Sequence, residues 1–195
     1  MGEDGASGAG AIVIITGPPG AGKTTVAASL AVRSAGPAVH LHSDDFYGYI
    51  RSGYIEPYRP ESRQQNRVVV GALAGAAADY AAGGYLVLLD GIIGPWFLGP
   101  FRHRAGRAGL PLHYVVLRPA LAEALARARG RPGPVRIESG PIRGLHEQFG
   151  RLGDLEAHAL DTTGQSAEQT IAAVGAAVAA GRMRLPPQTA GPAPG

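Results

Sequence analysis

The sequence predicts an α/β fold with three layers, in which a five-stranded parallel sheet is flanked by helices and carries a small lid. Short apolar runs alternate along the chain with helical patterns, as in proteins built from parallel strands and crossover helices. The first run, residues 11–16 (AIVIIT), is apolar on both faces, which is typical of a buried parallel strand. The length of 195 residues fits one domain, and the absence of cysteine excludes disulfides and thiolate chemistry.

The order of the elements follows from apolar runs, glycines and capping residues. The expected strands are residues 11–16, 39–42, 85–89, 113–117 and 157–160. The expected helices are residues 23–34, 61–82, one beginning near 120, and 166–180. Ser166 and Gln169 form a capping box at the start of the last helix. We expect residues 11–185 to form the domain, and the Gly- and Pro-rich ends, residues 1–10 and 186–195, to be disordered tails.

Charge and hydropathy argue against two classes of partner. The net charge of +3 is spread along the chain without a basic stripe, so no nucleic acid is expected as a partner. No apolar run approaches the ~20 residues that cross a bilayer, so no membrane is expected either. The acidic, Gly-rich start is unlike a signal peptide, which favours a cytoplasmic location. The oligomeric state stays open.

A phosphate-binding loop follows the first strand. The segment GPPGAGKT fits the P-loop pattern G-x-x-x-x-G-K-[ST] in full, between a strand and a helix. Glycines let successive backbone N–H groups point at phosphate oxygens, and the following helix presents its positive N-terminus to the same anion. Lys23, the only lysine of the chain, can reach the β- and γ-phosphates. The predicted nucleotide-binding residues are Gly17, Pro18, Pro19, Gly20, Ala21, Gly22, Lys23, Thr24 and Thr25.

The expected cofactors are ATP and Mg²⁺. The Thr24 hydroxyl is the predicted Mg²⁺ ligand. Asp90 follows the apolar third strand and is predicted to hold Mg²⁺ through water, with a loop cap as the alternative. GTP is the weaker choice, because an N-K-x-D guanine motif needs a lysine outside the P-loop.

Two neighbouring acids end the second strand, in the string HSDDFY. Ligands bind outside the carboxyl ends of strands in open parallel sheets, so Asp44 or Asp45 is a candidate general base for a hydroxyl that attacks the γ-phosphate. Only one of the two is expected to face the phosphates, and a helix N-cap or turn is the alternative for the pair.

The order of P-loop, strand ending in Asp-x-Phe-Tyr and strand ending in Asp resembles small-molecule kinases of the adenylate-kinase-like P-loop class. HSDDFY is similar to the base-bearing segment of uridine kinases, and the chain's size and its Asp after strand two resemble chloramphenicol phosphotransferase. The resemblance places Asp44 at the base position. It also implies that the segment after strand two closes over the acceptor, and that Thr162, after strand five, lies where related kinases hold the adenine.

The substrate side is predicted from aromatic and polar clusters. Four tyrosines fall within residues 47–58, and their flat faces with hydroxyl groups suit a ring-bearing acceptor. A polar helix face follows at i, i+3, i+4 spacing, and a second aromatic cluster follows Asp90. For the tyrosine segment and the polar helix face, the alternative is a solvated surface. For the second aromatic cluster, the alternative is packing in the core. The predicted substrate residues are Asp45, Tyr47, Tyr54, Tyr58, Arg63, Asn66, Arg67, Trp96 and Arg102.

A lid is expected at about residues 121–145, where arginines are interrupted by Gly and Pro. Arg127 and Arg131 are predicted to act with Lys23 in catalysis by offsetting charge on the transferring phosphoryl group, with a solvated helix as the alternative. The six histidines are scattered, so no transition-metal site is expected, and His40 and His42 are interpreted as structural.

The leading hypothesis is a kinase that moves the γ-phosphoryl group of ATP to a hydroxyl of a small molecule, such as an antibiotic or another natural product. A nucleoside or sugar acceptor is the alternative within this class. A nucleotide-dependent switch or ATPase acting with a protein partner, and a binding module without catalysis, belong to other classes.

Overall fold

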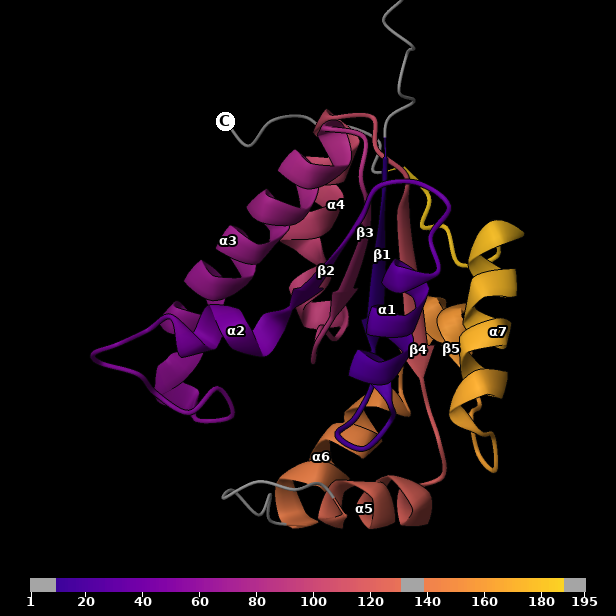
Figure 1. Ribbon diagram of the computed structural model, residues 1–195. Helices are drawn as coiled ribbons and strands as arrows, with labels where there is room; N and C mark the ends of the chain where they lie inside the picture. Colours follow the sequence, from indigo (N-terminus) through magenta and orange to yellow (C-terminus); the bar gives the residue numbers. More distant parts are fainter. Residues whose placement is uncertain (1–9, 131–138, 188–195) are drawn as a thin grey trace, which may run out of the picture.

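The computed structural model describes residues 10–130 and 139–187. Its centre is a parallel sheet with the strand order β2-β3-β1-β4-β5 (Figure 1). The strands are β1 (Ala11–Thr16), β2 (Ala38–His42), β3 (Leu86–Asp90), β4 (Leu112–Leu117) and β5 (Ala159–Leu160). The predicted α/β class with five parallel strands is confirmed. Of the expected tails, only Gly10, Pro186 and Pro187 lie within the described residues.

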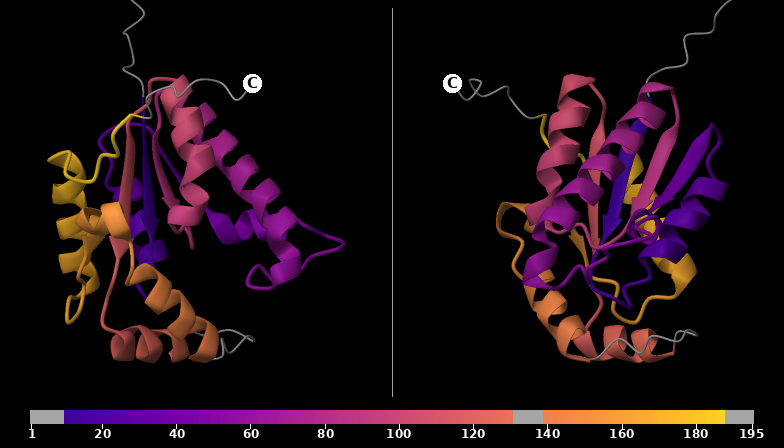
Figure 2. Two further views of the ribbon diagram at one scale, coloured as in Figure 1. Left: turned by 180° about the vertical axis from the view of Figure 1, so that it is seen from behind. Right: turned by 90° about the vertical axis from the view of Figure 1, so that its left-hand side faces the viewer.

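Helices cover both faces of the sheet, as Figures 1 and 2 show. The helices α3 (Arg63–Ala82) and α4 (Leu98–Arg107) pack on one face, and α1 (Lys23–Val32) and α7 (Ala167–Ala179) pack on the other. Side chains of β1 alternate between the two layers, because successive residues of a strand point to opposite faces. Ile12 and Ile14 therefore join the core under α3 and α4, while Val13 and Ile15 join the core under α1 and α7.

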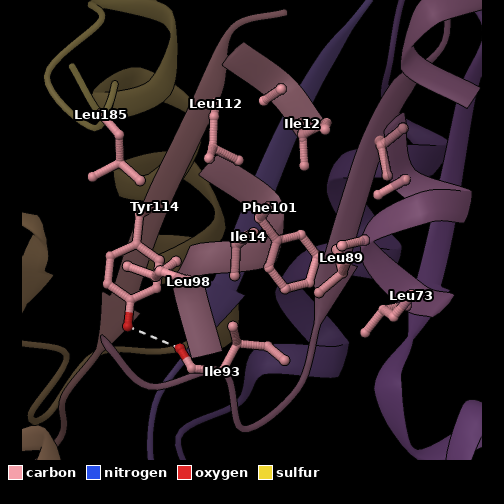
Figure 3. Close-up of a cluster of buried hydrophobic side chains, with 14 of the residues drawn as sticks. Ile12, Ile14, Leu73, Leu89, Ile93, Leu98, Phe101, Leu112, Tyr114 and Leu185 are labelled. Atoms are coloured by element: carbon pink, nitrogen blue, oxygen red, sulfur yellow. Dashed lines mark hydrogen bonds between the residues drawn. The ribbon is translucent and has the colours of Figure 1, made fainter. Parts of the chain in front are cut away.

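Figure 3 shows the larger of the two cores. Phe101 and Tyr114 are fully buried there, and the Tyr114 hydroxyl donates a 2.9 Å hydrogen bond to the carbonyl oxygen of Ile93. Burial raises the pKa of Tyr114, which keeps its hydroxyl protonated as a donor. The bond ties β4 to the loop that follows β3.

Several helices lie where the sequence analysis expected none. The segment after β2 begins with a short helix, α2 (Ser43–Gly48), and α4 and α6 (Ser139–Phe149) were not anticipated. In α4, Gly99, Pro100 and the basic residues obscure a helical spacing of buried side chains at Leu98, Phe101 and Ala105. Packing against the sheet, rather than helix propensity, supplies most of the stability of such a helix.

Smaller differences concern the ends of elements. The fifth strand has two residues instead of four, because the 3₁₀ helix η3 (Gly153–His158) occupies its expected start. Two further 3₁₀ turns, η1 (Pro60–Ser62) and η2 (Pro95–Phe97), precede α3 and α4. Within the expected lid, α5 (Leu121–Arg129) is described, whereas residues 131–138 lie outside the described part.

The topology makes the chain reverse direction across the sheet at the carboxyl ends of β1 and β3. These strands are neighbours in the sheet, yet the helices that follow them, α1 and α4, lie on opposite faces. The loops therefore diverge, and this is the position where open α/β sheets bind ligands. Figure 1 shows α5 and α6 beyond the same end of the sheet. Among the described residues, none of the helices is both long and apolar enough to span a membrane.

Candidate active site

The P-loop connects β1 to α1 through backbone conformations that favour glycine. Gly17, Gly20 and Gly22 have φ angles of 139°, 84° and 88°. At Gly20 an added Cβ would also collide with the backbone carbonyl of Ala124 in α5, so this position tolerates only glycine. The loop leads directly into the N-terminus of α1, which begins at Lys23, and the backbone N–H groups at a helix N-terminus can bind an anion.

Lys23 lies against the loop that precedes it. Its side chain is buried, and Nζ donates a 3.1 Å hydrogen bond to the carbonyl oxygen of Pro18. The predicted nucleotide-binding residues from Gly17 to Thr25 thus form one continuous segment, a loop followed by the first turn of α1, with a cation held close to the backbone. Such an arrangement can bind the phosphates of a nucleotide.

Asp90 is fully buried at the end of β3 and receives three hydrogen bonds. The Thr24 hydroxyl donates to Oδ2 at 2.6 Å, and His40 Nε2 and His42 Nδ1 contact Oδ1 at 2.6 Å and 3.0 Å. Burial alone would raise the pKa of Asp90, but the hydrogen bonds from His40, His42 and Thr24 outweigh burial and lower this pKa well below its ordinary value. Asp90 is therefore an ionised acceptor, and each histidine nitrogen that faces it donates.

The oxygen donors here fit a magnesium ion. A hydroxyl that donates its proton to Asp90 keeps its lone pairs for a cation, and Mg²⁺ prefers oxygen ligands. Residues 10–130 and 139–187 contain no group of three or more His, Cys, Asp or Glu side chains placed to hold a metal ion. The predicted roles of Thr24 as a direct ligand and of Asp90 acting through water stay predictions.

Asp44 and Asp45 lie in the first turn of α2, immediately after β2. The Asp44 side chain is 76% exposed, and its Oδ2 lies 3.5 Å from His42 Nε2. The hydrogen bond with His42 does most to lower the pKa of Asp44, and the charge of Lys23 adds to this effect. His42 thus contacts two carboxylates, and the hydrogen bonds to Asp44 and Asp90 raise the pKa of His42 to about 10. The structure places an exposed, ionised carboxylate within electrostatic reach of the P-loop lysine.

Two of the four clustered tyrosines lie near Asp44. Burial and then the negative charge of Asp44 raise the pKa of Tyr47 to about 12, and the same charge contributes to the raised pKa of Tyr54. Tyr54 is 45% exposed and also donates to Glu56 at 3.3 Å. Tyr58 is exposed on the same loop. Tyr47 and Tyr54 are therefore the two tyrosines of this loop whose hydroxyl groups feel the charge of the candidate base.

A family comparison places this site in a known class. A family model described as an AAA domain matches residues 12–150, which include the P-loop, Asp44 and Asp90. The chain belongs to this AAA domain family. A search of curated protein sequences gave no significant match.

Solved structures share the fold of this AAA domain. The tunicamycin resistance protein of Deinococcus radiodurans has a TM-score of 0.61 at 22% identity, covering 91% of this chain and 99% of that one. A sugar kinase from Janibacter sp. gives 0.65 at 16% identity, covering 87% and 95%. A gluconokinase from Sinorhizobium meliloti gives 0.63 at 19% identity, covering 88% and 93%. The chain thus shares its fold with these three proteins, two of which are described as kinases.

The polar face predicted on α3 of the AAA domain divides into two parts. Arg63 and Arg67 are exposed, whereas Asn66 is buried and its Nδ2 donates to the Pro57 carbonyl oxygen at 2.8 Å. Asn66 therefore holds the tyrosine-bearing loop, which corrects the expectation that it shares a substrate face with the two arginines. The 3₁₀ turn η1 directly precedes α3, and Asn66 Nδ2 also donates to the hydroxyl oxygen of Ser62, the last residue of η1, at 2.9 Å.

Gln65, which the sequence analysis did not single out, fastens the same loop. Its Oε1 accepts from the Ile55 backbone N–H at 2.8 Å, and its Nε2 donates to the Ile55 carbonyl oxygen at 2.6 Å. A single side chain thus pairs with both backbone groups of one loop residue. Nothing in local sequence spacing indicates such a contact, since it joins residues ten positions apart across an irregular loop.

The second aromatic cluster is divided between the core and the surface. Phe101 lies in the core, as the alternative of core packing expected. Trp96 is 47% exposed and packs against Phe149 of α6, with the ring centroids 5.8 Å apart. Arg102 lines a surface cavity with Arg184 and Leu112, the first residue of β4. This cavity lies at the amino end of the sheet, so the structure does not bring Arg102 to the P-loop.

Arg127 of the AAA domain joins α5 to the loop after β5. Its guanidinium contacts Glu123 and donates to the Gln165 carbonyl oxygen at 3.1 Å, while Glu123 accepts from the Gly164 backbone N–H at 2.9 Å. The hydroxyl of Thr162 in the same loop is buried and has no hydrogen-bond partner within the described structure. Arg131 lies outside the described residues. The roles predicted for these residues stay predictions.

Proposed function

We propose that the protein is a Mg²⁺- and ATP-dependent kinase that transfers the γ-phosphoryl group to a hydroxyl of a small molecule. One observation carries the proposal: the exposed carboxylate of Asp44 lies in the first turn of α2, directly after β2, and 3.5 Å from His42, which also contacts Asp90 beside Thr24 of α1. A P-loop that only binds nucleotide needs no carboxylate there, whereas a kinase must position the acceptor as well as the donor.

Each group has a defined task in this reaction. The P-loop N–H groups and Lys23 bind the β- and γ-phosphates, and Asp44 orients the acceptor hydroxyl. A bond forms between the acceptor oxygen and the γ-phosphorus, the bond from the γ-phosphorus to the β,γ-bridging oxygen breaks, the hydroxyl proton passes to Asp44, and ADP leaves. Because Asp44 is a weak base, its orienting role dominates and the proton moves late. When bound beside Thr24, Mg²⁺ offsets negative charge on the phosphates.

The acceptor is proposed to carry a ring system. Tyr47 and Tyr54 lie near Asp44 and offer aromatic faces with hydroxyl groups, which suit ring-bearing compounds more than short aliphatic alcohols. An antibiotic or another natural product is our first choice, supported by the likeness to the tunicamycin resistance protein. A nucleoside or sugar is the alternative, supported by the likeness to a sugar kinase and a gluconokinase.

Incubation with Mg²⁺ and ATP against a pool of nucleosides, sugars and hydroxyl-bearing antibiotics, followed by mass spectrometry, tests the proposal. We expect a product heavier by one phosphoryl group, whose identity names the acceptor class. Omission of ATP and the Lys23→Ala variant serve as controls. Release of ADP without a phosphorylated product would instead favour an ATPase or switch acting with a protein partner.

A further inference from the structure

The two histidines of β2 share one carboxylate oxygen of Asp90. His40 donates from Nε2 at 2.6 Å and His42 donates from Nδ1 at 3.0 Å, both to Oδ1. The Thr24 hydroxyl donates to the other oxygen at 2.6 Å. Both oxygens of this fully buried carboxylate are therefore engaged, and its rotation about the Cβ–Cγ bond would break at least one contact.

Strand register explains how three distant segments meet at Asp90. In the parallel pair β2–β3, His42 is the partner of Asp90 and His40 is the partner of Leu88. Alternate residues of a strand share a face, so both histidines lie on the Asp90 side, which α1 covers with Thr24 in its first turn. The imidazole centroids are 6.4 Å apart with planes tilted by 52°, so the rings approach Oδ1 from separate directions.

Two other interpretations of the histidine pair fit the structure less well. A transition-metal site is not supported, because the described residues hold no suitable group of three ligands and the ring nitrogens face a carboxylate oxygen. A role in core packing is not supported either, because the side chains of His40 and His42 are 23% and 29% exposed and belong to neither hydrophobic cluster. Both rings lie at the open end of the sheet, beside the P-loop.

We propose that His40 and His42 are positioning residues that fix the Asp90 carboxylate for Mg²⁺ binding. By occupying Oδ1, they keep Oδ2 directed at Thr24, whose hydroxyl then donates its proton to Asp90 and retains its lone pairs for the cation. The inference rests on the proposed function only in requiring that this P-loop binds Mg²⁺ with a nucleotide. Groups that orient a metal's surroundings in this way commonly control metal affinity.

Mn²⁺ serves as the probe, with its affinity for the ADP complex measured by electron paramagnetic resonance and no turnover required. His40→Ala and His42→Ala are each expected to weaken Mn²⁺ binding about tenfold. His40→Gln and His42→Asn place an amide N–H at the donating ring position and are expected to recover most of that loss. His113→Gln is the matched control, because His113 lies on β4 beside Arg184 and should leave Mn²⁺ affinity unchanged.

Equal Mn²⁺ affinity in the wild type and both alanine variants would overturn the positioning role alone. A loss that the Gln and Asn variants do not recover would also overturn it, since ring volume and not hydrogen bonding would then matter. A wild-type protein that binds neither ADP nor Mn²⁺ would refute the proposed function as well. If an alanine variant fails to fold, the Mn²⁺ affinities of His40→Asn and His40→Gln are compared instead. Only the longer glutamine amide reaches Asp90, so equal affinities would overturn the positioning role.

Discussion

The Thr24 hydroxyl donates a 2.6 Å hydrogen bond to Oδ2 of Asp90, across 66 positions of sequence. The bond joins the first turn of α1 to the end of β3, at the position where the loops after β1 and β3 diverge. Because the hydroxyl gives its proton to a carboxylate, its oxygen is free to serve as a ligand for a cation. The contact therefore links the phosphate-binding loop to the acid expected to act on Mg²⁺.

Replacing this hydroxyl should weaken metal-dependent nucleotide binding. Thr24→Val keeps the shape of the side chain but removes the donor and the ligand oxygen, so we expect Mg²⁺ to promote ATP binding about tenfold less effectively. Thr24→Ser, which keeps the hydroxyl, should behave like the wild type. Titration of a fluorescent ATP analogue at several Mg²⁺ concentrations measures the difference. Equal Mg²⁺ dependence in both variants would exclude Thr24 as a ligand.

Asp44→Asn and Asp45→Asn should differ in phosphoryl transfer. Asp44 contacts His42 and is influenced by the Lys23 charge, so its loss should lower kcat for acceptor phosphorylation by about 10²- to 10⁴-fold. ATP affinity, measured by calorimetry, should change little, because neither acid belongs to the P-loop. If Asp45→Asn abolished transfer while Asp44→Asn did not, the assignment of the base would be reversed.

Tyr114→Phe should destabilise the fold without touching the site. The substitution removes the donor to the buried Ile93 carbonyl oxygen, and an unsatisfied buried group of this kind costs about 1–3 kcal/mol. Urea unfolding followed by circular dichroism gives the change in the free energy of unfolding. Tyr80→Phe is the control, because Tyr80 is 45% exposed and its loss of a hydroxyl should change stability by less than about 0.5 kcal/mol.

His113 should make the protein less stable at mildly acidic pH. Burial, and then the charge of Arg184, lower the pKa of His113 below its ordinary value of 6.5. Below about pH 6.5, His113 therefore binds a proton more readily in the unfolded chain than in the folded chain. Stability is full while His113 is neutral at higher pH, and part of it is lost as pH falls through the folded-state pKa of His113. We expect urea midpoints to fall less steeply from pH 7.5 to 5.5 in His113→Phe than in the wild type.

The same comparison separates His113 from His42, whose effect has the opposite sign. The raised pKa of His42, about 10, gives stability that is fully present below pH 6.5 and declines as pH rises toward 10. His42 is unchanged in both proteins, so its contribution cancels when their pH profiles are subtracted. Identical profiles in the wild type and His113→Phe would show that His113 titrates equally in the folded and unfolded chains.

Local patterns in the sequence were enough to predict the fold class, which the structure confirms, and to locate the P-loop between β1 and α1. A buried strand, a Gly-rich turn and a helix follow one another within residues 11–32, so the P-loop can be identified without knowing what packs around it. Asp90 is likewise predictable, because it directly follows an apolar run and parallel strands present their carboxyl ends together. Spacing along a single segment carries this information.

Tertiary structure alone decided the contacts between segments. The sequence alone leads to a structural interpretation of His40 and His42. Their place beside Asp90 follows only from the pairing of β2 with β3. Asn66 contacts the Pro57 carbonyl oxygen and Arg127 contacts the Gln165 carbonyl oxygen for the same reason, since these partners lie in other segments. Strand order and helix placement are set by burial of apolar faces across long sequence separations, and short-range periodicity holds no record of which strands become neighbours.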